Sequence, residues 1–92
     1  NTTEIRIECE EKEKFKIIDK VIKNQKNKKY SDIDGIRVEL ENGWWLMRAS
    51  NTQAAMVLRC EANSKKDLDE IISIVKNEIK KISPELSKQI LA

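Results

Sequence analysis

Two segments of this chain alternate strictly between apolar and charged residues, and this pattern limits the fold more than any other feature of the sequence. Residues 4–10 read Glu-Ile-Arg-Ile-Glu-Cys-Glu, and residues 36–41 read Ile-Arg-Val-Glu-Leu-Glu. A period of two predicts strands in which only one face is apolar. A sheet built from such strands has one solvated face, so we expect the helices to pack together on the other face.

Apolar residues at helical spacing occur in two places. Between Lys12 and about Asn24 they suit one face of a helix and comprise Phe15, Ile17, Ile18, Val21 and Ile22. A second stripe follows the capping-box sequence of residues 64–67 and comprises Leu68, Ile71, Ile72, Val75, Ile79 and Ile82. Ser83-Pro84 is expected to end this helix, and Pro84 suits the first turn of a short terminal helix within 83–92.

The middle of the chain predicts strands that are neighbours in space. Asn42-Gly43 separates residues 36–41 from the apolar run 44–47, and Asn-Gly here is a strong hairpin signal because both residues tolerate positive φ. After a loop at 49–54, residues 55–61 return as a further strand, and such short loops favour antiparallel pairing. Residues 30–35 are expected to turn, with a short edge strand before the turn.

The predicted element order is therefore β-α-β-β-β-α within a single domain that spans residues 1–92. We expect an α+β fold with an antiparallel four-stranded sheet and two helices packed on one face. The outer face of that sheet is then charged and carries Arg6, Glu8, Arg37, Glu39, Arg59 and Glu61.

The composition excludes several classes of protein. The 18 Lys and Arg residues nearly balance 16 Asp and Glu residues, so no strong field attracts nucleic acid or a membrane surface. Long apolar runs and a basic leader are missing, which argues against a transmembrane or secreted chain. The two cysteines, Cys9 and Cys60, are far apart and favour a reduced, cytoplasmic setting. Because the chain lacks an initiator Met, we expect a processed chain or an excised piece of a longer one.

Candidates for catalysis are scarce. The chain has no His, which excludes imidazole bases, imidazole metal ligands and nucleophile pairs that need them. Cys9 and Cys60 fall in the buried phase of their strands and are interpreted as small core residues rather than nucleophiles. The carboxylates are dispersed, so we expect no catalytic and no metal-binding residue in this chain.

One polar segment, residues 48–53, does not resemble scaffold. Arg48 supplies a planar guanidinium, Ser50 and Thr52 supply hydroxyls, and Asn51 supplies an amide. This set of donors matches the oxygens of a phosphate group. The alternative is a polar turn in which residues 50–52 cap their own backbone and Arg48 lies on the surface. The segment alone leaves both interpretations open.

The surrounding residues add a resemblance to a known family. In order, the chain has Asp34-Gly35-Ile36-Arg37-Val38, Gly43-Trp44, Arg48-Ala49-Ser50-Asn51-Thr52 and a strand that ends in Glu61-Ala62. Over essentially the whole chain this resembles the C-terminal domain of the phosphohexomutases, in particular the phosphomannomutase/phosphoglucomutase branch. The resemblance implies a TBP-like α+β domain in which Arg48, Ser50, Asn51 and Thr52 bind the phosphate of a hexose phosphate that is not being transferred. The backbone around Gln53 would help to hold it.

The resemblance also implies which chemistry lies elsewhere. In that family a phosphoserine, a magnesium loop and a sugar-reading loop belong to the preceding domains, so magnesium is implied for the parent enzyme and no cofactor for this domain. The parent would be an isomerase that acts by intramolecular phosphoryl transfer, and the isolated 92-residue fragment would be inactive. The implied partners are mannose or glucose 1- or 6-phosphate and the upstream domains. Asn51 favours the mannose and glucose branch over glucosamine phosphate, whereas Gln53-Ala54 replaces a common Glu-Pro and leaves the sugar open.

The alternative function is a free-standing module that binds protein or nucleic acid on the outer sheet face. A basic cluster at Lys26, Lys28 and Lys29 would suit nucleic acid, but Tyr30 is the one aromatic beside it, so a solvated loop is favoured. Trp44-Trp45 could stack on a sugar or pack in a core or interface. Adjacent residues of a strand point to opposite faces, so one of the two is expected to face the helices.

Overall fold

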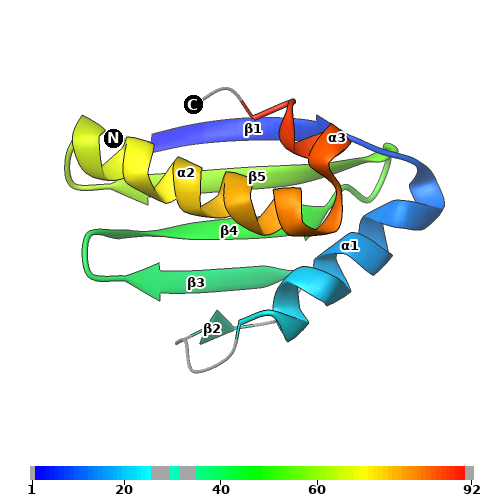
Figure 1. Cartoon of the computed structure of the whole chain (residues 1–92), viewed down its shortest axis with the longest axis horizontal. Helices are drawn as coiled ribbons and strands as arrows, with labels where there is room; N and C mark the ends of the chain where they lie inside the picture. Colours follow the sequence, from blue (N-terminus) through cyan, green and yellow to red (C-terminus); the bar gives the residue numbers. More distant parts are fainter. Residues whose placement is uncertain (1, 26–29, 32–34, 91–92) are drawn as a thin grey trace.

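The alternating segments form the antiparallel sheet that their pattern predicts. The structure is a computed structural model, and it describes residues 2–25, 30–31 and 35–90. Its elements are β1 (Thr2–Glu8), α1 (Glu11–Lys23), β2 (Tyr30–Ser31), β3 (Ile36–Leu40), β4 (Gly43–Ala49), β5 (Ala55–Ala62), α2 (Lys65–Ile82) and α3 (Pro84–Ser87). The sheet order is β1-β5-β4-β3-β2, and α1 and α2 cover the same face (Figure 1). The predicted α+β fold is confirmed, and the two-residue β2 adds a short edge strand to the four long strands.

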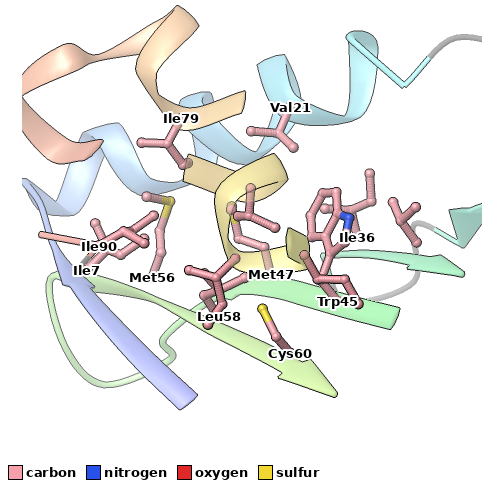
Figure 2. Close-up of a cluster of buried hydrophobic side chains, with 14 of the residues drawn as sticks. Ile7, Val21, Ile36, Trp45, Met47, Met56, Leu58, Cys60, Ile79 and Ile90 are labelled. Carbon is pink, nitrogen blue, oxygen red and sulfur yellow. The ribbon is translucent and has the colours of Figure 1, made fainter. Parts of the chain in front are cut away.

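The core lies between the helices and the sheet and consists of the side chains that each layer turns toward the other. β5 lies between β1 and β4, and Leu58 at its centre pairs with Ile5 on one side and Met47 on the other. Figure 2 shows these inward side chains meeting α1 and α2, and the labelled residues are Ile7, Val21, Ile36, Trp45, Met47, Met56, Leu58, Cys60, Ile79 and Ile90. The six charged residues predicted for the outer face are all exposed.

The first strand is displaced from its predicted range of 4–10. β1 begins at Thr2 because its pairing with β5 extends to the register Thr2 with Glu61. It ends at Glu8, and the backbone N–H of Cys9 then donates to the carbonyl oxygen of Ala54 at 3.1 Å. Glu10 already serves as the N-cap residue of α1. The alternation between apolar and charged residues reflects burial, and burial can continue to alternate beyond the end of a strand. The segment that leads into the N-cap of α1 therefore extends the pattern past Glu8.

The predicted hairpin between β3 and β4 is present, and Gly43 has a positive φ together with a second role. Leu40 pairs with Gly43, so Glu41 and Asn42 join the strands and Gly43 is the first residue of β4. A Cβ on Gly43 would collide with the carbonyl oxygen of Glu61. The glycine is therefore required both by its positive φ of 157° and by the close approach of β5.

The buried stripe of α1 also differs from the prediction. Ile17, Ile18 and Val21 are buried as expected, whereas Phe15 is 59% exposed. Lys14, 1% exposed, occupies the inward position next to it. The inward stripe is thus 14, 17, 18 and 21, which has helical spacing equally well.

The second helix agrees closely with its sequence pattern. Ser64 caps it, since its Oγ accepts a hydrogen bond from the backbone N–H of Asp67 at 3.1 Å. Ser83 follows its last residue and also caps α3, which covers Pro84–Ser87 within the range predicted for a terminal helix. Leu91 of that predicted helix lies outside the described residues. Beyond α3, the side-chain amide of Gln89 binds both the N–H and the carbonyl oxygen of Glu8, each at 2.8 Å.

The tryptophan pair divides between the two faces of the sheet, as the parity of the strand predicts. Trp45 is 1% exposed and belongs to the core. Trp44 lies on the outer face, where its Nε1 donates to Glu61 at 2.9 Å and the Arg37 guanidinium lies 4.1 Å from its ring centroid. Hydrogen bonds from Thr2 and Trp44 lower the pKa of the Glu61 carboxyl.

The cysteines have the character of core residues. Both thiols are free, and burial raises the pKa of Cys60 from its ordinary 9.0 to about 11. Burial also raises the pKa of Cys9. A thiol that resists ionisation is a weak nucleophile. Cys60 is buried in the core as predicted, whereas Cys9 lies beyond the end of β1, half-buried and packed against the core. Among the helices of the described residues, none has the length and apolar character needed to cross a bilayer.

Candidate functional site

The polar segment singled out in the sequence forms the connection between β4 and β5, at one end of these inner strands and beside α1 (Figure 1). Arg48 is the last residue but one of β4, and its side chain is exposed. Residues 50–54 form the loop, which is closed by two backbone hydrogen bonds. The N–H of Ser50 donates to the carbonyl oxygen of Ala55 at 2.9 Å. The N–H of Ala55 donates to the carbonyl oxygen of Gln53 at 2.8 Å. The loop is therefore a compact turn with a defined shape.

A depression of about 380 Å³ lies between this connection and α1. Arg48, Ala49 and Asn51 line one part of it, Gly35 lines another, and α1 contributes Phe15, Ile18, Asp19 and Ile22. The structure thus brings Arg48 and Asn51 together at one depression. Ser50 and Thr52 belong to the same loop, half-buried and exposed respectively, but they do not line this depression.

The hydrogen-bond donors of the segment are unused by the described part of the protein. Within residues 2–25, 30–31 and 35–90, the side chains of Arg48, Ser50, Asn51 and Thr52 make no hydrogen bond or ion pair. In the same ranges, the backbone N–H groups of residues 51–54 donate to no protein acceptor. The alternative of a turn capped by its own side chains therefore finds no supporting hydrogen bond among these residues. The segment offers a guanidinium, hydroxyls and free amides to a ligand.

Gly35 sets how closely β3 approaches this segment. Its φ of 124° lies in the region that side chains other than glycine rarely adopt. A Cβ at this position would collide with the carbonyl oxygen of Met47 and lie 2.9 Å from Cβ of Arg48. Gly35 thereby lets the start of β3 pack directly against the backbone that carries Arg48.

Lys14 is a residue of this site that sequence reasoning missed. Its ammonium donates to the carbonyl oxygen of Ser50 at 2.6 Å and to that of Gln53 at 3.1 Å. It also forms an ion pair with Glu11, at 2.7 Å from Oε1. The available signal was the spacing 14, 17, 18 and 21, which places a lysine in the buried stripe of a helix.

The part of the chain that the structure describes contains no cluster of side chains that could bind a metal ion. No three His, Cys, Asp or Glu side chains gather there as a metal site requires. Asp19 is the one carboxylate among the residues that line the depression. The residues that line the depression thus include one carboxylate and one guanidinium, from Asp19 and Arg48. The basic cluster at 26–29 lies outside the described residues.

Comparisons with known proteins agree with the resemblance in the sequence. The family model "Phosphoglucomutase/phosphomannomutase, C-terminal domain" matches residues 4–78. A phosphomannomutase/phosphoglucomutase from Pseudomonas syringae is 40% identical over 88 residues, which is 94% of this chain and 19% of that protein. A probable phosphoglucosamine mutase from Methanosarcina acetivorans is 42% identical over 73 residues, which is 78% of this chain and 16% of that protein.

A solved structure shares both the fold and the sequence pattern. The crystal structure of a phosphoglucomutase/phosphomannomutase family protein from Burkholderia thailandensis matches with a TM-score of 0.78 and 33% identity, over 91% of this chain and 18% of that chain. The chain thus spans about a fifth of the length of the relatives it matches. Because the family model covers most of its residues, this chain belongs to the phosphoglucomutase/phosphomannomutase family and corresponds to the C-terminal domain of those proteins.

Proposed function

We propose that this chain is the phosphate-clamping domain of a phosphohexomutase, and that it binds the phosphate of a hexose phosphate that is not being transferred. The observation that carries the proposal is the set of unused donors at residues 48–54, beside a depression large enough for a phosphate group. Arg48 would give two parallel hydrogen bonds to phosphate oxygens. Ser50, Asn51, Thr52 and the free amides of the loop would complete the contacts.

The contribution of such a clamp to catalysis would be position and charge. Phosphoryl transfer depends mainly on alignment of the reacting groups and on stabilisation of negative charge. Holding the distant phosphate fixes where the rest of the sugar lies, although no bond changes at the clamp. The substrate class would be mannose or glucose phosphate. Magnesium would serve the preceding domains of the parent enzyme, as the family resemblance implies.

The alternative, a module that binds a macromolecule through the outer sheet face, has less support. That face carries both signs of charge, and Arg37 and Glu61 are already engaged with Trp44. A nucleic-acid surface would need a more uniformly basic face.

Arg48→Lys tests the clamp. The unmodified chain is expected to bind inorganic phosphate weakly, with a Kd around the millimolar level, or about 4 kcal/mol. The affinity is low because the domains that would surround the sugar are not part of this chain. Arg48→Lys should raise the Kd roughly tenfold, since a point charge cannot reproduce a two-pronged contact. The measurement is a phosphate titration followed by backbone amide chemical shifts.

Two control variants accompany this titration. Arg59→Lys makes the same exchange at an exposed position of β5, and Lys28→Ala removes a charge from the basic cluster. Both should leave the Kd nearly unchanged. The clamp is wrong if the shifts centre on residues 26–30 instead of 48–53, or if Arg48→Lys binds phosphate as well as the unmodified chain.

The isolated chain should show no mutase activity. The phosphoserine and the metal ligands that the family uses have no counterpart among these 92 residues. We therefore expect no conversion of mannose 6-phosphate or glucose 1-phosphate above the buffer rate, even with magnesium and a sugar bisphosphate activator. A coupled assay checks this, and any turnover that scales with protein concentration would contradict the assignment of catalysis to other domains.

A further inference from the structure

The ammonium of Lys14 is buried and fully occupied. Its side chain is 2% exposed, and its three acceptors are the carbonyl oxygens of Ser50 and Gln53 and the carboxylate of Glu11. A lysine ammonium has three N–H donors, so these contacts use its whole capacity. Burying a charge in this way is costly unless it is paired and hydrogen-bonded. The Lys14 ammonium is therefore a buried cation whose donors are all paired within the candidate site.

Lys14 joins segments that are far apart in the sequence. The two carbonyl oxygens that it binds lie 36 and 39 residues further along the chain, on either side of Asn51 and Thr52. The ammonium thus fixes both ends of the central loop against the first turn of α1. A backbone hydrogen bond from Ser50 to Ala55 closes the base of the loop, and Lys14 supplies the contacts from α1.

The two carbonyl contacts also determine the direction of neighbouring amides. In a trans peptide group, the carbonyl oxygen of one residue and the N–H of the next point in opposite directions. The oxygen of Ser50 points to Lys14, so the N–H of Asn51 points away from it. The same holds for the oxygen of Gln53 and the N–H of Ala54. Both N–H groups belong to the set without an acceptor among the described residues.

We propose that Lys14 is a positioning residue for phosphate binding, which holds the loop 50–54 in the shape that presents its free amides and side chains. This inference rests on the proposed function. Lys14 does not bind the phosphate itself, because all of its donors are engaged. Its positive charge is balanced by Glu11, so its effect on the anion comes from the shape of the loop.

The variant that tests this proposal is Lys14→Met, which keeps most of the length of the side chain and removes the ammonium. Lys12→Met is the matched control, since it removes the same charge from an exposed position of the same helix. Near-ultraviolet circular dichroism first establishes that each variant is folded. Lys14→Met should then raise the Kd for inorganic phosphate at least about fivefold and shift the amides of Asn51 and Ala54 before phosphate is added. Lys12→Met should do neither.

Salt separates positioning from a direct effect of charge. Added NaCl screens the attraction between charges that are not in contact. If Lys14 acts through the shape of the loop, the ratio of the Kd of Lys14→Met to that of Lys12→Met, which has the same net charge, should stay constant as NaCl is raised. A ratio that falls toward one with added salt would overturn the proposal.

A measurement on the unmodified chain decides the case if Lys14→Met does not fold. The Lys14 ammonium should give a nitrogen-detected NMR signal that exchanges slowly with water and persists when phosphate saturates the chain. Exchange as fast as that of the exposed lysines, or loss of the signal on phosphate binding, would overturn the proposal. If the unmodified chain shows no shifts at 48–53, the clamp fails and this inference fails with it. If it binds and Lys14→Met binds equally well, only the role of Lys14 is wrong.

Discussion

Leu58→Ala is expected to lower the free energy of unfolding by about 2–5 kcal/mol, as large-to-small changes in a packed core do. Leu58 is fully buried at the centre of β5, the strand between β1 and β4. Its side chain points to the layer between sheet and helices (Figure 2). Truncation there loses apolar burial and leaves a cavity that the paired strands on both sides cannot close.

Arg59→Ala is the control for this variant, since the next residue of the same strand faces solvent. It should cost less than about 1 kcal/mol, because exposed charges contribute little to stability. Urea titrations of both variants, followed by tryptophan fluorescence, make the comparison. Equal losses would mean that the inward and outward faces of β5 are wrongly assigned.

Gly35→Ala is expected to cost a similar amount, about 2–6 kcal/mol, and to weaken phosphate binding as well. Part of the cost, about 1–3 kcal/mol, comes from forcing a side chain onto a φ of 124°. A further cost of about 1–3 kcal/mol comes from overpacking, since the new Cβ collides with the carbonyl oxygen of Met47 and crowds Arg48. Relief of the collision must move the start of β3 or the end of β4.

Leu58→Ala serves as the comparison for the binding effect. Both substitutions destabilise the chain, but only Gly35→Ala disturbs the backbone that carries Arg48. Phosphate titration at a temperature where both variants are folded should therefore show a raised Kd for Gly35→Ala and an unchanged Kd for Leu58→Ala. A Gly35→Ala variant with the stability and affinity of the unmodified chain would show that β3 approaches Arg48 less closely than described.

Most of the fold could be predicted because burial leaves a periodic trace in the sequence. The alternation around Ile36 and the helical stripe from Leu68 to Ile82 are both found in the structure. The boundaries were less accurate at β1 and at the β3–β4 turn, where Gly43 serves a close contact between strands. At Lys14 and Phe15 the prediction was wrong, since periodicity ranks residues by polarity and cannot foresee that a buried lysine will find partners across the fold.

The candidate site was only partly accessible to sequence reasoning. Arg48 and the polar residues after it were identifiable from the types of donor they gather within a few positions. The contribution of α1 was not, because folding alone brings Lys14 to the loop and Asp19 to the depression beside it. Asn51 lines the depression with Arg48, whereas spacing alone could not separate it from Ser50 and Thr52.

The side chain of Gln89 has a consequence for the exposed edge of the sheet. β1 is an outer strand of the sheet, and such strands can recruit a strand from another chain. At Glu8 the Gln89 amide satisfies the backbone donor and acceptor together, as a peptide group of an added strand would do. The segment after α3 thus occupies a position on β1 where a strand from another chain could pair. At Glu8, the last residue of β1, the backbone is therefore closed to the hydrogen bonds of an added strand.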